Sequence, residues 1–211
     1  MQIVLLRHAA TDWNLEGRCQ GSSDLELNAT GIGQARAVAE LLAGERIHAV
    51  YSSRLKRARQ TAELVSRPHG LGVAVEEDLH ELDHGQLEGL TFDDVKIRYS
   101  EFLERWRTEP AEIRVPGGEK LVEVAERAWN GLNRIVLRHR DEETLVVVSH
   151  HFPILGIVCR ITGTDLNRYR TFRLEPCSLT RLNLSPARRW SITEMNGVPC
   201  APGTPAQPLE G

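Results

Sequence analysis

The sequence has little of what marks secreted, zinc-binding or membrane-spanning proteins. It holds four cysteines in 211 residues and no C-x-x-C pair, so we expect free thiols rather than a disulfide framework or a zinc site. It has no apolar run of about 18 residues, the length that spans a membrane. The opening apolar run at residues 3–6 is also too short for a signal peptide. These absences lead us to expect a cytoplasmic protein.

An excess of charge of one sign is also missing. Acidic and basic residues are interspersed along the chain, and the formal net charge is -3. Such a balance gives no reason to expect a nucleic acid or an anionic membrane as a partner. A local group of basic side chains, which the sum over the whole chain hides, can still bind a small anion.

The chain length and a hydrophobic content of 41% suit one core, which predicts a single domain over residues 1–196. Short apolar runs alternate with helical periodicity, which predicts an α/β fold with a mostly parallel sheet. The expected strands are 3–6, 48–51, 73–75, 145–148, 178–184 and 190–195; the expected helices are 30–42, 55–65, 92–107, 120–139 and 152–161. We expect the last two strands to be antiparallel edge strands and residues 11–29 to be a loop. The Pro- and Gly-rich residues 197–211 are expected to form a disordered tail.

Residues suited to phosphate chemistry follow three of the expected strands. Arg7 and His8 follow the first strand, Arg57 comes shortly after the second, and His150 and His151 follow the fourth. Ligands of open α/β sheets bind outside the carboxyl ends of the strands, so we expect these side chains to meet at one edge. Arginine binds phosphate oxygens with paired donors, and histidine can act as a nucleophile or an acid–base. The pattern favours a phosphate monoester as the ligand.

Ordered blocks of sequence resemble the histidine phosphatase superfamily, which includes the cofactor-dependent phosphoglycerate mutases. Residues 6–14 are similar to its R-H-G-x-T-x-x-N signature, residues 51–62 to S-S-x-L-x-R-A-x-Q-T-A, and residues 79–89 to L-x-E-x-x-x-G-x-x-E-G. Further blocks are residues 17–35, 116–119 and 147–150. The blocks follow the family order, which makes the resemblance specific. It implies a three-layer α/β/α sandwich with a small helical cap at about 91–116.

The resemblance implies catalytic roles for five residues. His8 would attack phosphorus in line and carry the phosphoryl group. Arg7, Arg57 and His150 would hold the phosphate oxygens and stabilise the transition state. Glu81 would protonate the departing alkoxide and then activate the water that hydrolyses the phosphohistidine. The family needs no metal or other cofactor, because its cations are protein side chains.

The resemblance also implies substrate-binding positions. Asn14 would contact the phosphate and orient His8. Gln20 and Gly21 would line the pocket, Gly21 through its backbone. His151 stands where the family commonly has glycine or another small residue, so we expect it to narrow the pocket or to add a donor.

The resemblance leaves more than one function open. Mutases of the family carry an inserted Pro-rich basic segment, whereas residues 91–112 have an ordinary helix pattern. We therefore favour hydrolysis of a small phosphorylated metabolite, with a cofactor-dependent phosphoglycerate mutase as the alternative. A non-catalytic phospholigand-binding protein would be expected to have lost the nucleophile or the proton donor, and both are present. The sequence does not specify the monoester or the oligomeric state. The cap residues expected to set specificity are Phe92, Arg98, Tyr99, Phe102, Arg105, Trp106 and Arg107.

Overall fold

Within the described part of the chain, the strands form one six-stranded sheet. The computed structural model describes residues 1–197. The strand order is β3-β2-β4-β1-β5-β6; the first four run parallel, and β5 is antiparallel to both β1 and β6. The strands are β1 (Gln2–Arg7), β2 (Ala49–Ser52), β3 (Val73–Val75), β4 (Thr144–Ser149), β5 (Leu179–Leu184) and β6 (Trp190–Gly197). The predicted α/β fold, with a mostly parallel sheet and an antiparallel pair at one edge, is confirmed.

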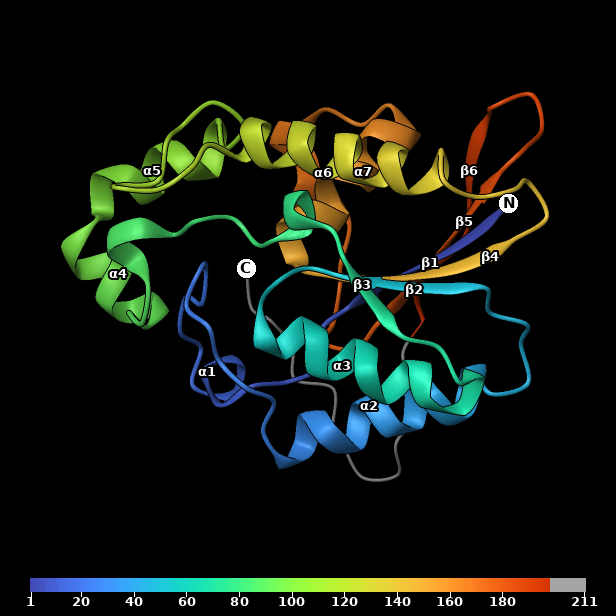
Figure 1. Cartoon of the computed structure of the whole chain (residues 1–211). Helices are drawn as coiled ribbons and strands as arrows, with labels where there is room; N and C mark the ends of the chain where they lie inside the picture. Colours follow the sequence, from blue (N-terminus) through green and yellow to red (C-terminus); the bar gives the residue numbers. More distant parts are fainter. Residues whose placement is uncertain (198–211) are drawn as a thin grey trace.

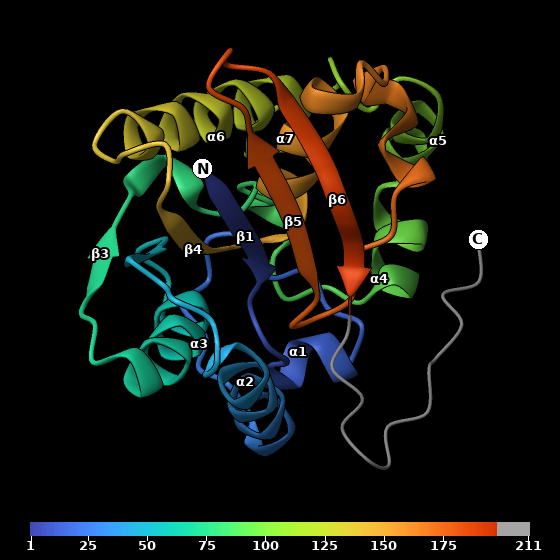
Figure 2. The same cartoon turned by 90° about the vertical axis from the view of Figure 1, so that its right-hand side faces the viewer.

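Helices cover both faces of the sheet in three layers (Figures 1 and 2). α6 (Leu121–Val136) and α7 (His151–Thr162) pack on one face, and α2 (Ala29–Leu42) and α3 (Lys56–Ser66) pack on the other. Successive side chains of a strand point to opposite faces, so Ile3 and Leu5 of β1 join one buried cluster while Val4 and Leu6 join the other. Burial on both faces is why the interiors of the central strands, residues 3–6 and 145–148, are apolar.

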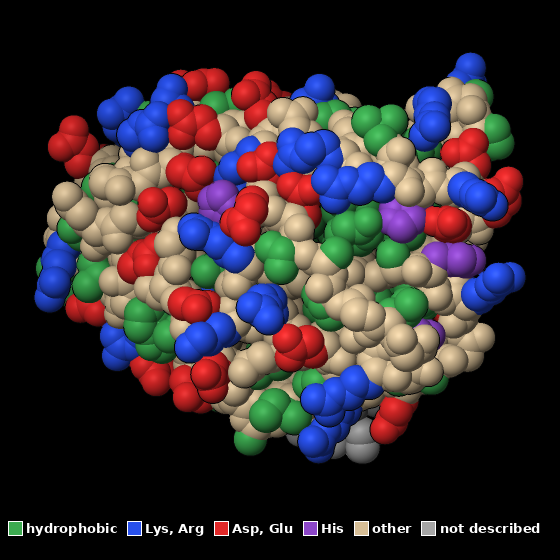
Figure 3. Space-filling model, in the orientation of Figure 1, with side chains coloured by type: hydrophobic (Ala, Val, Ile, Leu, Met, Phe, Trp, Pro, Cys, Tyr) green, Lys and Arg blue, Asp and Glu red, His purple; other side chains and the backbone are tan. Residues whose placement is uncertain are grey.

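The shorter helices gather at the end of the molecule toward which β1 runs (Figure 1). They are α1 (Asp12–Leu15), α4 (Phe92–Arg98) and α5 (Ser100–Thr108). Over the face seen in Figure 3, acidic and basic side chains are interspersed, as the sequence predicts. Within residues 1–197, no helix combines the length and the apolar character needed to cross a membrane.

Several expectations from the sequence are wrong in detail. The helix expected at 92–107 is two helices that meet at Tyr99, whose backbone is not helical (φ -132, ψ 38). The break lets Val95 of α4 and Trp106 of α5 both enter the core, and no glycine or proline marks it. The loop expected at 11–29 contains α1, which Thr11 caps through a reciprocal capping box.

The end of the chain also differs from the expectation. β6 extends to Gly197, because pairing with β5 continues as far as Leu179. The rest of the expected tail, residues 198–211, lies outside the described residues. Cys19, Cys159 and Cys177 are free thiols, as expected; Cys200 is also outside the described residues.

Candidate active site

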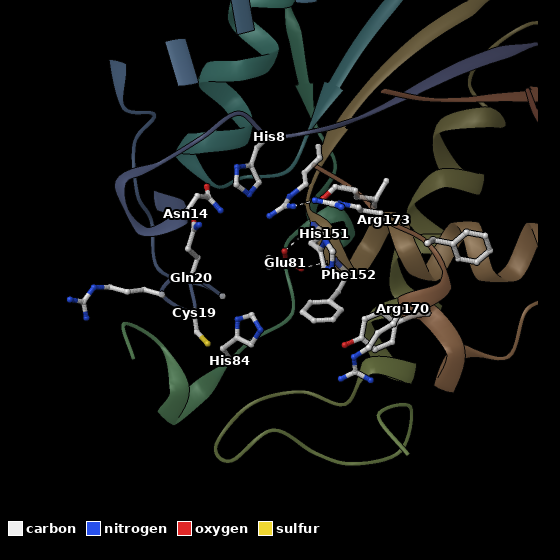
Figure 4. A pocket seen from close by; sticks show the side chains of 16 residues that line it. His8, Asn14, Cys19, Gln20, Glu81, His84, His151, Phe152, Arg170 and Arg173 are labelled. Atoms are coloured by element: carbon white, nitrogen blue, oxygen red, sulfur yellow. Dashed lines mark hydrogen bonds between the residues drawn. The ribbon is translucent and has the colours of Figure 1, made fainter. Parts of the chain in front are cut away.

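A pocket of about 580 Å³ opens where the parallel strands end (Figure 4). Arg7 ends β1 and lies beside Ser149, which ends β4. The residues that follow these two strands, His8 and His150, therefore lie at the same edge of the sheet, and their ring centroids are 5.0 Å apart. The predicted site residues that line the pocket are Arg7, His8, Asn14, Gln20, Gly21, Glu81 and His151. Arg57 and His150 are fully buried behind this lining.

His8 has a fixed tautomer. Its Nδ1 lies 2.8 Å from the carbonyl oxygen of Ala9. A carbonyl can only accept, so Nδ1 carries the hydrogen and Nε2 carries the lone pair. Burial lowers the pKa of His8 well below its ordinary value, and the charges of Arg57 and Arg7 lower it further. The imidazole is therefore neutral, which is the form that a nucleophile needs.

His150 is held by Ser53, the residue that follows β2. The Oγ of Ser53 lies 2.7 Å from Nε2 of His150, and both side chains are fully buried. If the hydroxyl donates to Nε2, Nδ1 carries the hydrogen. If Nε2–H donates to the hydroxyl oxygen instead, the hydroxyl hydrogen and the lone pair of Nδ1 both lack partners. The first arrangement leaves fewer buried polar groups unsatisfied. The Nδ1–H, which has no partner among the described groups, is then a donor suited to an anion.

Two arginines bring positive charge to the site: Arg57 is fully buried and Arg7 is partly buried. Arg7 donates from Nη1 to the carbonyl of Leu174 at 2.6 Å. Arg57 donates from Nη1 to the carbonyl of Ser23 and from Nη2 to that of Gly21, both at 2.7 Å. Within the described residues, neither guanidinium has a carboxylate partner, and the Nε of each is unpaired. Burial lowers the pKa of Arg57 to about 10, so this guanidinium is charged at neutral pH. Partly or fully buried cations without a carboxylate partner favour an anionic ligand.

Glu81 lies at the N-terminus of α7. Its Oε1 accepts from the backbone N–H of Leu82 at 2.9 Å and of Phe152 at 3.1 Å, and its Oε2 accepts from that of His151 at 3.0 Å. The first amides of a helix have no partner within it and carry its positive end, so they bind a carboxylate well. Oε2 accepts one hydrogen bond, which leaves room for a proton.

Asn14, Gln20 and His151 supply polar groups to the pocket wall. The Oδ1 of Asn14 accepts from the backbone and the hydroxyl of Thr11, at 3.0 Å and 3.1 Å, so the amide nitrogen remains for a ligand. The Oε1 of Gln20 and the Nδ1 of His151 are buried, and neither has a partner among the described groups. Burial, and then the charge of Arg7, lower the pKa of His151 well below its ordinary value. His151 therefore contributes a neutral ring.

The backbone conformation at residue 21 requires glycine. Its φ of +51 lies in the left-handed region, and a Cβ there would be 2.2 Å from Oε1 of Glu88. Its carbonyl accepts from Arg57. Gly21 thus couples the pocket loop to the buried guanidinium.

Comparison with known proteins assigns the chain to a family. The model of the histidine phosphatase superfamily (branch 1) matches residues 3–197. The chain belongs to this superfamily. It is 34% identical over 196 residues to phosphoserine phosphatase 1 of Hydrogenobacter thermophilus, covering 93% of this chain and 92% of that one. It is 31% identical over 183 residues to the probable phosphoglycerate mutase GpmB of Serratia proteamaculans, covering 87% and 85%.

A solved structure agrees with this assignment. The mycobacterial glucosyl-3-phosphoglycerate phosphatase, in a complex with VO3, superposes with a TM-score of 0.84 at 29% identity, covering 92% of this chain and 98% of that chain. The present chain is therefore an enzyme of the histidine phosphatase family, as its sequence blocks predict. Among the described residues of this histidine phosphatase, no group of three His, Cys, Asp or Glu side chains is placed to hold a metal ion.

One wall of the histidine phosphatase pocket comes from residues 169–174, which the sequence analysis did not predict. Part of this wall belongs to a 3-10 helix (Leu166–Thr171) that follows α7. The ring of Tyr169 lies 5.6 Å from that of Phe152. No local periodicity marks the segment, and its position depends on packing against α7. The unpredicted lining residues are Arg18, Cys19, His84, Phe152, Tyr169, Arg170, Phe172, Arg173 and Leu174.

The cap does not line the pocket directly. None of the aromatic and arginine residues expected to set specificity is among the lining residues. Trp106 instead supports the wall: its ring lies 6.1 Å from that of Phe152, and its Nε1 donates to the hydroxyl of Tyr169 at 3.3 Å. Phe102 packs against Trp106 at 5.5 Å. In this histidine phosphatase, the cap shapes the pocket from behind.

Proposed function

We propose that this histidine phosphatase hydrolyses small phosphate monoesters without a metal ion, through a phosphohistidine formed on His8. The observation that carries the proposal is the tautomer of His8, whose Nδ1 is committed to the carbonyl of Ala9. The lone pair of Nε2 is thus available in a pocket that also holds Arg7 and Glu81. Nε2 attacks phosphorus, a P–N bond forms, and the P–O bond to the leaving group breaks.

The two arginines and the N–H donor of His150 stabilise the charge of the phosphoryl group. Arg7 and Arg57 carry positive charge without carboxylate partners among the described residues. His150 adds a neutral N–H donor that Ser53 orients. Preorganised donors of this kind stabilise the transition state because they need no rearrangement during the reaction.

Glu81 moves the proton in both steps. In the first step its Oε2 donates a proton to the departing alkoxide oxygen. In the second step it accepts a proton from the water that attacks phosphorus and displaces Nε2. Inorganic phosphate leaves, and both Glu81 and the lone pair of His8 return to their starting states. The N-terminus of α7 keeps this carboxyl group in place throughout.

The names of the relatives support phosphorylated metabolites as the substrate class. They include a phosphoserine phosphatase and a glucosyl-3-phosphoglycerate phosphatase. The relative named a probable phosphoglycerate mutase keeps isomerisation as the second candidate. Hydrolysis is favoured because residues 91–112 lack the Pro-rich basic insertion that the mutases carry.

A panel of phosphate monoesters, assayed in EDTA, tests the proposal. We expect p-nitrophenyl phosphate to be hydrolysed in EDTA and His8→Asn to lose at least about 10³-fold in kcat. The matched control is His48→Asn, since His48 precedes β2 at the other end of the sheet. Rapid acid-free quenching of a ³²P-labelled substrate should trap an alkali-stable, acid-labile phosphoenzyme.

Other outcomes point to the alternatives. Loss of turnover in EDTA contradicts the metal-independent mechanism. Conversion of 3-phosphoglycerate to 2-phosphoglycerate without phosphate release indicates a mutase. Tight phosphate binding with no turnover of any ester indicates a non-catalytic binding protein.

A further inference from the structure

The unpredicted wall carries an arginine whose charge has no carboxylate partner. Three arginines line the pocket in addition to the one that ends β1. Arg18 pairs with Glu16 at 2.5 Å, and Arg173 pairs with Glu175 at 2.6 Å. Within residues 1–197, Arg170 makes no salt bridge. Its charge is therefore available to a ligand in a way that the other two are not.

The guanidinium of Arg170 is held in a defined position. Its central carbon lies 4.7 Å from the ring centroid of Tyr169, a cation–π contact. Nη1 and Nη2 each donate to the carbonyl of Trp106 at 3.4 Å. These long bonds use one hydrogen of each nitrogen, and a further hydrogen bond joins the side chain of Arg170 to the hydroxyl of Tyr169. Two of the five N–H groups therefore remain for a ligand. A guanidinium that is held in this way is preorganised to donate its remaining N–H groups to a carboxylate.

The position of Arg170 suits the leaving group rather than the phosphoryl group. In Figure 4, Phe152 lies between His8 and Arg170. The rings of Phe152 and Tyr169 form an apolar surface beside it. Among the described lining residues, Glu81 is the one carboxylate, so the pocket can take more negative charge than one phosphate brings.

We infer that Arg170 binds a carboxylate on the leaving group, so that the preferred substrates are phosphate monoesters of hydroxy acids. This inference rests on the proposed phosphatase function and specifies its substrate class. The phosphoryl group would lie at His8, and the acid would extend along Phe152 to the guanidinium.

Matched pairs of substrates test the inference. O-phosphoserine and O-phosphoethanolamine differ by one carboxylate, and so do 3-phosphoglycerate and glycerol 3-phosphate, in which the acid is replaced by an alcohol. We expect the wild type to have the higher kcat/KM for the acid of each pair. Arg170→Gln should lower the acid-to-neutral ratio of kcat/KM by about 10-fold, the effect of one charge-assisted contact, mainly through KM. Arg170→Lys should restore part of the ratio.

Arg168→Gln is the matched control, because Arg168 lies in the same 3-10 helix but does not line the pocket. It should leave both ratios unchanged. Equal losses for both members of a pair, or a ratio unaffected by Arg170→Gln, would overturn the inference while leaving the phosphatase proposal intact. Failure of the wild type to hydrolyse any of the four esters or p-nitrophenyl phosphate would instead refute the proposed function.

Discussion

Replacing Ser53 with alanine tests the buried network that orients His150. The substitution removes the Oγ that lies 2.7 Å from Nε2 of His150 and that accepts the backbone N–H of Leu55 at 3.3 Å. Each of these buried groups then lacks a partner, and one such group costs about 1–3 kcal/mol. We expect the free energy of unfolding to fall by that order. We expect kcat to fall roughly 10- to 100-fold, because the Nδ1–H donor toward phosphate is no longer fixed.

Ser52→Ala provides the control. Ser52 is also fully buried, but its hydroxyl donates to the carbonyl of Ser53 at 3.0 Å and does not touch the histidine. It should lose stability on urea unfolding without a comparable loss of kcat. The ¹⁵N shifts of His150 report the tautomer directly, with the hydrogen on Nδ1 in the wild type and a mixture in Ser53→Ala. Wild-type kcat together with an unchanged tautomer in Ser53→Ala would refute the reasoning.

Four further predictions follow from the site. The pKa of His8 is lowered by burial and by two arginines, so the acid limb of kcat/KM should lie below about pH 6.5, the ordinary value for histidine; a limb at or above that pH contradicts the assignment. The pKa of buried His150 is lowered as well, so the unfolded state binds more protons, and urea unfolding should show stability falling as pH drops below about 6.5; constant stability from pH 7.5 to 5.5 would disagree. Gly21→Ala forces a Cβ against Glu88, so it should lower the free energy of unfolding by about 1–3 kcal/mol and reduce activity. A variant with the melting temperature and turnover of the wild type would contradict this prediction. Glu81→Gln should slow the hydrolysis of alkyl phosphates by about 10²- to 10⁴-fold. It should slow the first step with p-nitrophenyl phosphate much less, since nitrophenolate leaves without a proton. Equal slowing of the first step with both kinds of substrate would exclude Glu81 as the acid.

The sequence alone predicted the strands and helices that have a locally repeated pattern. Apolar runs located β1 and β4, and helical spacing located α2 and α6. The parallel order of the strands then placed Arg7, His8 and His150 at one edge, because parallel strands end on the same side of a sheet. Features without a local pattern were not predicted. The helix α1 has only four residues, and no glycine or proline marks the break at Tyr99.

Other features of the site depend on contacts between residues far apart in the chain. The hydrogen bonds from the N-terminus of α7 to Glu81 join residues about 70 positions apart. The wall at 169–174 lines the same pocket as Arg7 and His8, which are more than 150 positions earlier in the chain. No pattern within either segment encodes such a contact, because it exists only after the sheet has formed. The sequence by itself therefore determined the family, the layers and the reactive residue types. The tertiary structure alone decided the tautomer of His8, the partners of Glu81 and the side chains that form the pocket wall at 169–174, because packing and desolvation act between segments that are far apart in the chain.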